Sequence, residues 1–157
     1  MSCVSALRSI VACVALATMA GGTQAGDISI LGNWEIVEAM PAPWSAPTDR
    51  AALHAEGRRL LKTEVTFETA SVKSKFKPFE CKSKVIYTPN AIEPDALFQG
   101  NLPEPNPATA AARLGFPRGD VPGVDVRCLK ALYTFHFRDP DTALININRV
   151  IYTLKRR

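Results

Sequence analysis

The sequence predicts a mainly β protein, an antiparallel barrel or half-barrel of seven to eight short strands with one or two short helices. Short segments in which apolar and polar residues alternate recur from residue 28 to residue 154, as expected for half-buried strands. Gly, Pro, Asn and Asp residues separate many of these segments. Seven or eight short strands are most simply accommodated in a closed sheet, because closure removes exposed strand edges.

Composition and charge exclude several classes of protein. With 157 residues, 46% of them hydrophobic and 22% charged, the chain suits one globular domain and not a disordered or fibrous protein. Its 19 Lys and Arg residues against 15 Asp and Glu residues give a net charge of +4, well short of a dedicated nucleic-acid binder. We therefore expect no nucleic-acid partner.

The N-terminal segment has the three parts of a secretory signal peptide. A single basic residue, Arg8, precedes an apolar run, and small and polar residues then lead to a cleavage site after Ala25. The apolar run is shorter than the roughly 20 residues that a membrane-spanning helix needs. We expect a signal peptide over residues 1–25, a single β domain over residues 26–157 without a transmembrane segment, and a periplasmic or secreted location. An uncleaved anchor and a lipoprotein acylated at Cys13 are the alternatives.

Two cysteines remain after this cleavage, Cys81 and Cys128. A pair of cysteines in an exported domain predicts one disulfide. The bridge would close a loop of about 47 residues, for which the chain-entropy model gives roughly 4 kcal/mol of stabilisation. Two free or metal-binding thiols are the alternative, but no nearby Cys or His completes the ligand spacing of a zinc site. We expect no metal and no cofactor.

The first half of the domain predicts strands around one helix. Residues 28–37 predict a strand, and the three prolines of residues 40–47 disfavour both a helix and a central strand. Residues 48–59 predict a helix with Thr48 as its N-cap, which Gly57 weakens or ends. Further strands are expected over residues 60–67, 72–77 and 81–87.

The second half contains an irregular segment followed by closely spaced strands. Residues 88–123 hold seven prolines, and a segment of this length without strands is usually functional or mobile. Within it, residues 107–114 predict a short helix that opens with a proline and is capped by Asn106. Turn signals at residues 139–141 and 148–149 predict an antiparallel meander. Its strands are expected over residues 124–129, 132–137, 143–147 and 150–154.

Gly32 and Trp34 form a Gly-x-Trp motif at the head of the first predicted strand. The motif resembles the opening of lipocalin-like proteins, and the layout is also similar to that of small secreted bacterial proteins. The lipocalin resemblance implies that Trp34 packs across the closed end of the barrel beneath a basic side chain near the last strand. We assign that basic side chain to Arg149, with Lys155 and Arg156 as alternatives. An ordinary core position is the other interpretation of Trp34.

Five lysines within twelve residues form the most unusual polar feature of the sequence. Strand alternation would project each group from one side of a strand, so that a hairpin would gather them into one cationic patch. Such a patch favours an anionic partner, for example a polysaccharide, a lipid headgroup or an acidic protein surface. Lysines that protect an exposed strand edge from aggregation are the alternative interpretation. The five residues are Lys73, Lys75, Lys77, Lys82 and Lys84.

Residues with catalytic potential form no recognisable catalytic motif, and we expect that the protein is not an enzyme. Neither Ser45 nor Ser71 lies in a Gly-x-Ser-x-Gly motif. The histidines are His54, on the predicted helix, and His136, on the strand face opposite Phe135. We interpret His136 as a surface or hydrogen-bonded strand residue, with ligand contact or general-base catalysis as alternatives. The acidic pairs, interpreted as solvated, are Glu35/Glu38, Glu64/Glu68 and Asp139/Asp141.

These features favour an exported, non-catalytic binding domain. It would hold a small apolar or amphipathic molecule inside the barrel, or an anionic partner on the lysines. The alternative is a protein inhibitor of an exported hydrolase, for which the proline-rich residues 101–107 would form a stiff inhibitory loop. A hydrolytic enzyme is a third hypothesis.

Cleavage of the signal peptide predicts a protein that begins at Gly26. After expression with export, intact-mass spectrometry should give the mass of residues 26–157 less two hydrogen atoms, because one disulfide forms. Alkylation of the unreduced protein should add no label. An intact leader, or two thiols that react without prior reduction, would contradict this prediction.

Overall fold

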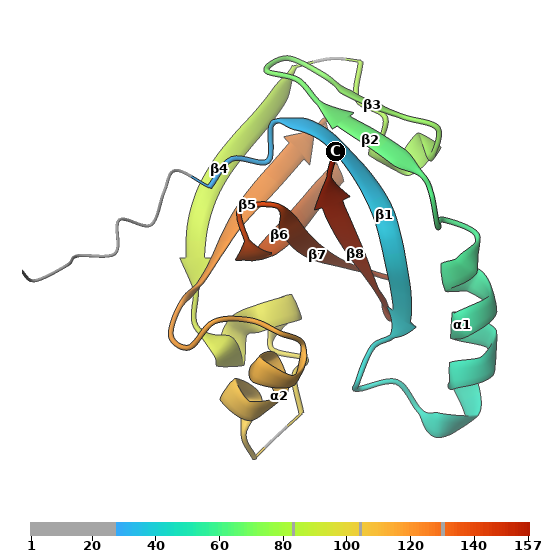
Figure 1. Cartoon of the computed structure of the whole chain (residues 1–157), viewed down its shortest axis with the longest axis vertical. Helices are drawn as coiled ribbons and strands as arrows, with labels where there is room; N and C mark the ends of the chain where they lie inside the picture. The colour runs from blue at the N-terminus through green and yellow to red at the C-terminus, as the bar shows by residue number, and fades with distance from the viewer. Residues whose placement is uncertain (1–27, 83, 104, 130) are drawn as a thin grey trace, which may run out of the picture.

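The computed structural model describes residues 28–82, 84–103, 105–129 and 131–157, so the predicted signal peptide lies outside the described residues. Eight antiparallel strands form a nearly closed barrel (Figure 1), which confirms the predicted mainly β fold. No helix in the described part of the chain has the length and apolar character to cross a bilayer. The strands are β1 (Gly32–Pro41), β2 (Glu64–Phe67), β3 (Val72–Ser74), β4 (Val85–Ile92), β5 (Val121–Cys128), β6 (Ala131–Asp139), β7 (Thr142–Ile147) and β8 (Val150–Arg156). The helices are α1 (Arg50–Arg58), α2 (Pro107–Arg113) and the 3₁₀ helices Pro47–Asp49, Lys77–Phe79 and Pro94–Gln99.

The order of the strands in the sheet is β3-β2-β1-β8-β7-β6-β5-β4, so the first and last strands of the chain lie side by side. In the ladder between β1 and β8, Trp34 is opposite Arg156. Strands β4 to β8 follow one another as an antiparallel meander, which confirms the topology expected for the C-terminal strands. Asn148 and Arg149 have φ values of 50° and 65° in the turn between β7 and β8, as in a tight type I′ hairpin.

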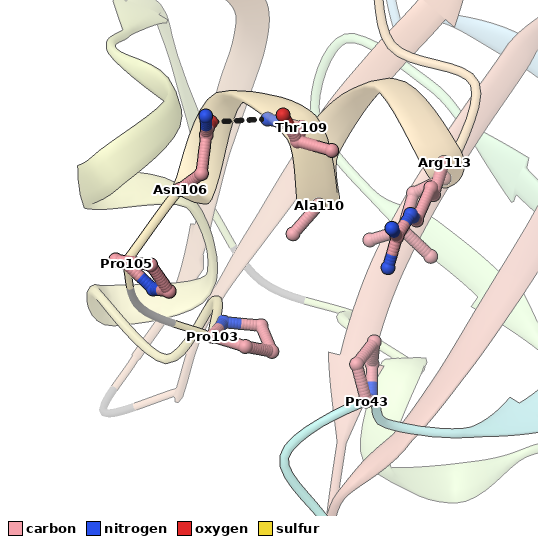
Figure 2. A pocket seen from close by; sticks show the side chains of 8 residues that line it. Pro43, Pro103, Pro105, Asn106, Thr109, Ala110 and Arg113 are labelled. Carbon is pink, nitrogen blue, oxygen red and sulfur yellow. Dashed lines mark hydrogen bonds between the residues drawn. The ribbon is translucent and has the colours of Figure 1, made fainter.

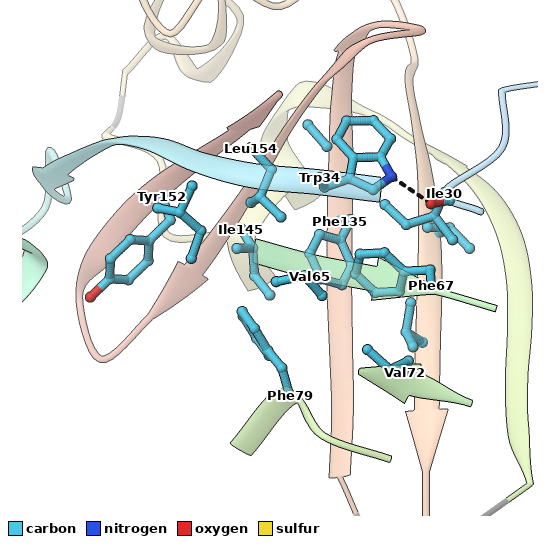
Figure 3. Close-up of a cluster of buried hydrophobic side chains, with 14 of the residues drawn as sticks. Ile30, Trp34, Val65, Phe67, Val72, Phe79, Phe135, Ile145, Tyr152 and Leu154 are labelled. Atoms are coloured by element: carbon cyan, nitrogen blue, oxygen red, sulfur yellow. Dashed lines mark hydrogen bonds between the residues drawn. The ribbon is translucent and has the colours of Figure 1, made fainter. Parts of the chain in front are cut away.

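Side chains from every strand fill the interior of the barrel. Figure 3 shows part of this core. Trp34 and Ile36 of β1 and Phe137 of β6 are fully buried. Phe67 of β2 and Phe135 of β6 pack edge to face across the interior, with ring centroids 5.3 Å apart. The interior is therefore a packed core, as expected for a barrel of this size.

A disulfide closes the gap between β3 and β4, the two edge strands of the sheet. Cys81 precedes β4 and forms an isolated antiparallel bridge with Val72 of β3. The disulfide joins Cys81 to Cys128 of β5, with Cα atoms 6.0 Å apart, as predicted from the cysteine count. The chain that leaves β3 is thereby held against the other edge of the sheet.

Two tyrosine hydroxyl groups add polar contacts across the same gap. The Tyr87 hydroxyl of β4 donates a hydrogen bond to the carbonyl oxygen of Glu68 in the turn between β2 and β3 (2.7 Å). The Tyr133 hydroxyl of β6 donates to the carbonyl oxygen of Pro78 (2.8 Å). Burial, with a smaller effect of the Glu68 charge, raises the pKa of Tyr87 to about 12, so its hydroxyl stays protonated and able to donate.

Helix α1 differs from the prediction at both of its ends. The helix begins at Arg50, and the residue at its N-cap is Asp49 rather than Thr48, without a side-chain capping bond. Gly57 lies inside the helix instead of ending it. A Cβ atom at this position would lie only 2.9 Å from the Cβ of Ala39 in β1. Glycine therefore allows α1 to pack closely against β1.

The boundaries of several strands differ from the predicted ones. β1 continues to Pro41, past the expected boundary of the proline-rich segment. The chain after α1 forms a turn in which Lys62 has φ of 64°, so β2 begins only at Glu64. β3 ends at Ser74, and the expected strand over residues 72–77 is formed only in its first half.

The segment expected to be irregular, residues 88–123, contains the ends of two strands. β4 continues through Pro89 to Ile92, and β5 begins at Val121. β4 tolerates Pro89 because it is an edge strand, in which one side of the backbone has no ladder partner.

The rest of this segment, residues 93–103 and 105–120, packs on the outer face of the sheet. Leu144 of β7 and Ile151 of β8 alternate with residues of the barrel core and belong to a separate cluster of buried side chains. A second core therefore lies outside the barrel, between the sheet and the covering segment. The covering segment contributes Leu97, Phe98, Leu102, Ala111, Leu114 and Phe116 to this outer core.

Replacing Cys128 by Ser should destabilise the protein strongly. The bridge spans 47 residues. Its loss frees the unfolded chain, and the chain-entropy model puts the cost at roughly 4 kcal/mol, or about 10 to 20 °C in Tm. Thermal denaturation followed by circular dichroism checks this, and the double variant Cys81→Ser/Cys128→Ser controls for effects of the remaining thiol. A Tm equal to that of the unmodified protein would contradict the prediction.

Candidate functional site

Helix α2 forms where the sequence predicts a helix. The side-chain oxygen of Asn106 accepts a hydrogen bond from the backbone N–H of Thr109 (2.8 Å), and Pro107 occupies the first helical position. Three consecutive alanines then favour the helix while adding little side-chain bulk. As a result, hollows border α2 on two sides.

Aromatic packing holds the segment that contains α2 against the rest of the protein. The Phe98 ring lies 5.6 Å from the Trp44 ring and 6.0 Å from the Phe116 ring, measured between centroids. Trp44 belongs to the connection between β1 and α1, whereas Phe98 and Phe116 lie on either side of α2 in the chain. The contacts therefore fix α2 relative to the chain that leaves β1.

A groove of about 260 Å³ lies between α2 and this connection (Figure 2). Pro43, Ala110 and Leu114 give it an apolar lining, and Figure 2 shows the Ala110 methyl group directed into the groove. Thr109 and the exposed Arg113 add a hydroxyl group and a guanidinium on the side of α2. An apolar hollow with a few convergent polar groups is the usual form of a small-molecule site.

The proline-rich residues 101–107 border the other side of the groove. Pro103 and Pro105 line it. Leu102 is only 4% exposed and packs in the outer core. The segment expected to form a stiff loop is therefore anchored to the protein by Leu102.

Trp34 is fully buried in the barrel core. Its indole N–H donates a hydrogen bond to the carbonyl oxygen of Ile30 (2.6 Å; Figure 3). The guanidinium carbon of Arg156 lies 4.4 Å from the centre of the indole ring, in a cation–π contact. Arg156 also donates to the carbonyl oxygens of Leu31 (2.7 Å) and Ser29 (2.6 Å), so one arginine ties the chain before β1 to the end of β8.

The assignment of the cation–π role to Arg149 is wrong. Arg149 lies in the turn before β8, at the opposite end of this strand from Arg156, and its guanidinium forms an ion pair with Asp49 (2.6 Å). Arg156, one of the alternatives, contacts the ring because it is the partner of Trp34 in the ladder. Paired residues on neighbouring strands lie on the same face of a sheet.

The five lysines expected to form a patch lie on the chain between β2 and β4, and not on the two strands of a hairpin. Lys73 is in β3, and Lys75 and Lys77 follow the end of that strand. Lys82 and Lys84 precede β4. All five are exposed, but the turns between them prevent a single row of side chains.

Carboxylates accompany three of these lysines. Lys73 forms an ion pair with Glu68. Lys77 and Lys82 lie 2.9 Å and 3.5 Å from the two carboxylate oxygens of Glu80. The pKa of Glu80 is lowered, chiefly by the hydrogen bond from Lys77. These pairs compensate part of the local positive charge, and their position beside an edge strand suits the protection of that edge.

His136 lies on the outer face of β6 but is only 3% exposed, so the expected surface position is wrong. The covering segment buries it, with the rings of Phe98 and Phe116 packed edge to face against the imidazole at 4.8 Å and 6.4 Å. Burial lowers the pKa of His136 to about 4, against an opposing effect of the Asp125 carboxylate. The imidazole is therefore uncharged at pH 7.

The other residues with catalytic potential lie apart from one another. His54 is exposed on α1. The Ser45 hydroxyl donates to the carbonyl oxygen of Arg149 (3.4 Å), and the Ser71 hydroxyl donates to the Glu68 carboxylate (2.6 Å). Among the described residues, no three His, Cys, Asp or Glu side chains are arranged to hold a metal ion.

Sequence reasoning did not identify the groove residues Pro43 and Arg113. They are distant in the chain and come together only because residues 93–120 fold over the outer face of the sheet. An arginine in the last turn of a short helix is also a common partner of the helix dipole, so Arg113 has no distinguishing signal. The sequence feature that could have pointed to the groove is the presence of two proline-rich segments, residues 40–47 and 101–107, because prolines from both segments line it.

Comparisons with protein-family models, with curated proteins and with solved structures find no match for this chain. The candidate site is therefore defined by its own geometry.

Acidification should destabilise the protein between about pH 6.5 and pH 4. In the unfolded chain His136 has its ordinary pKa near 6.5, whereas its folded pKa is about 4. The unfolded state therefore binds more protons in this window, and stability falls by about 2 kcal/mol between pH 7 and pH 5. Urea denaturation at several pH values measures this loss.

Two variants test whether His136 is the cause. His136→Leu should remove most of the pH dependence of the unfolding free energy above pH 5, because leucine suits a buried site and does not titrate. His54→Gln removes the exposed histidine and should leave the pH dependence as it is. The same pH dependence in His136→Leu as in the unmodified protein would contradict the assignment.

Proposed function

We propose that the protein is an exported, non-catalytic binding domain that holds a small amphipathic ligand with an anionic group in the groove beside α2. The main support is the groove itself, an apolar hollow of about 260 Å³ with a guanidinium at its rim. The signal-peptide pattern of residues 1–25 and the disulfide between Cys81 and Cys128 support export.

The residues of the groove suggest the chemistry of the ligand. Pro43, Ala110 and Leu114 would contact an apolar body, and their burial against it supplies most of the binding free energy. Arg113 would bind an anionic group by a charge-assisted hydrogen bond, and the Thr109 hydroxyl would donate a second one. The two polar groups lie four residues apart on α2, on one face of the helix.

A ligand inside the barrel, the position expected from the sequence, has less support. Fully buried side chains such as Trp34 and Phe137 occupy that space. Opening it would require the removal of core contacts on which the fold depends. The groove needs no such rearrangement, because its walls are already formed.

The two other recognition hypotheses remain predictions. An anionic macromolecule on the lysines has less support than the groove ligand, because Glu68 and Glu80 pair with three of the five side chains. Inhibition of an exported hydrolase by residues 101–107 has less support because Leu102 anchors that segment. A stable complex with such a hydrolase, lost when residues 103–105 are replaced by glycine, would favour the inhibitor.

The probe pair 1-anilinonaphthalene-8-sulfonate and N-phenyl-1-naphthylamine tests the groove, because the two molecules share their rings and only the first carries a sulfonate. Arg113→Gln should weaken binding of the sulfonate probe by about three- to ten-fold and leave the neutral probe unaffected. Ala110→Phe should fill the groove and weaken the binding of both probes. Fluorescence titration measures the Kd values.

Arg58→Gln is the matched control, because Arg58 also lies in the last turn of a helix but on α1. It should leave both Kd values unchanged. Added salt should weaken the binding of the sulfonate probe only, because salt screens the attraction between the sulfonate and the Arg113 guanidinium. Unchanged binding of both probes by Ala110→Phe would place the site elsewhere and contradict the proposal.

A further inference from the structure

A second pocket lies on the outer face of the sheet, between β6, β7 and the 3₁₀ helix Pro94–Gln99. Its volume is about 160 Å³. Phe98 and Leu132 give it apolar walls, and His136 and Asn146 contribute polar atoms. The pocket residues on β6 and β7 do not line the groove beside α2. Phe98 lies near both sites, because its ring also packs against Trp44.

The pocket lies where the pairing of β6 with β7 stops. The ladder extends from the turn between these strands as far as His136 opposite Leu144. Thr134 and Asn146 are next on the same face, but among the described residues they are not paired with each other; Thr134 pairs with Asp125 of β5 and Asn146 with Ile151 of β8. The two strands therefore leave a space at this point of the sheet, and the pocket occupies it.

Two buried polar atoms at the pocket have no hydrogen-bond partner among the described residues. They are Nδ1 of His136, whose side chain is 3% exposed, and Oδ1 of Asn146. The Thr134 hydroxyl is already engaged, because it donates to the Asp125 carboxylate (2.6 Å). Buried polar groups in folded proteins nearly always have a partner, so these two atoms indicate a ligand with complementary groups.

The backbone beside the pocket is strained. Phe98 and Gln99 have φ values of 52° and 64°, in the left-handed region that residues other than glycine rarely adopt. Both residues line the pocket, and the conformation of Phe98 sets its ring edge to face against His136. Such strain concentrates at binding and catalytic sites, where the surrounding packing maintains it.

We propose that this pocket is a second ligand site and binds a single-ring phenol. A hydroxyl group can accept and donate at once. It would accept a hydrogen bond from His136 Nδ1–H and donate one to Asn146 Oδ1, and one group would thereby satisfy both buried atoms. The ring would lie against Phe98 and Leu132.

Size and charge both favour this class of ligand. A cavity of about 150 Å³ lined by apolar residues holds benzene, so a pocket of this volume suits one aromatic ring. The imidazole is uncharged at pH 7, and the Asp125 carboxylate nearby disfavours an anion. An uncharged ring with one hydroxyl group meets these conditions, whereas the groove beside α2 suits an anionic ligand.

Titration of the disulfide-bonded protein with phenol and with anisole tests the proposal. Anisole has the same ring but no hydroxyl proton, so phenol should bind about ten-fold more tightly. In ¹⁵N NMR spectra, phenol should shift the imidazole resonances of His136 and the side-chain amide of Asn146. The imidazole shifts also report whether Nδ1 carries the proton.

Three variants locate the binding. Asn146→Leu should reduce the affinity for phenol about ten-fold, to that for anisole, while the affinity for anisole stays unchanged. Ala96→Phe, at an exposed position on the rim, should block both ligands without disturbing the core. Arg113→Gln, in the groove, should leave phenol binding unchanged.

Several outcomes would overturn the proposal. They are equal affinities for phenol and anisole, phenol-induced shifts confined to residues of the groove, or the absence of shifts at millimolar phenol. Failure here leaves the groove proposal standing, because that proposal is tested with other probes at other residues.

Discussion

Close packing inside the barrel is the constraint on which the rest of the structure depends. Trp34 and the aromatic side chains of the opposite strands fill the space between the walls, and Arg156 lies over the indole ring at one end. The disulfide and two tyrosine hydroxyl groups hold the chain around β3 against β4, β5 and β6, so the sheet is held closed around this core. A barrel filled in this way is stable, and both proposed sites lie outside it.

The segment between β4 and β5 turns the outer face of the sheet into a second buried layer. Phe98 connects the two candidate sites, because it packs against Trp44 near the groove and against His136 beside the second pocket. The left-handed backbone at Phe98 and Gln99 lets the chain place this ring there. A change at Phe98 would therefore disturb both sites, whereas changes at Arg113 or Asn146 affect one site each.

Charge is distributed so that the candidate sites differ in the ligands they can accept. The groove has an exposed guanidinium at its rim, and the second pocket has an uncharged imidazole with a carboxylate nearby. The lysines lie elsewhere, on the chain that crosses the gap between the edge strands, and Glu68 and Glu80 neutralise some of them. This position favours a role in protecting β3 from association with other chains.

Local sequence determined the features that depend on neighbouring residues. The alternation of apolar residues and the turn at Asn148 predicted the C-terminal meander, Asn106 predicted the start of α2, and the cysteine count predicted the disulfide. The first two signals suffice because hydrogen bonding and side-chain alternation act over a few residues. The disulfide spans 47 residues, but the expected mature domain has only two cysteines and so only one possible pair.

Tertiary packing alone decided which residues are covered and which meet. The burial of His136, the contact of Arg156 rather than Arg149 with Trp34, and the groove between Pro43 and Arg113 all depend on strand register or on the segment that crosses the sheet. Periodicity shows that a strand has two faces, but it does not show that a distant segment covers the outer one. Such contacts arise from the burial of apolar area between parts of the chain that are far apart in sequence, and no local pattern encodes them.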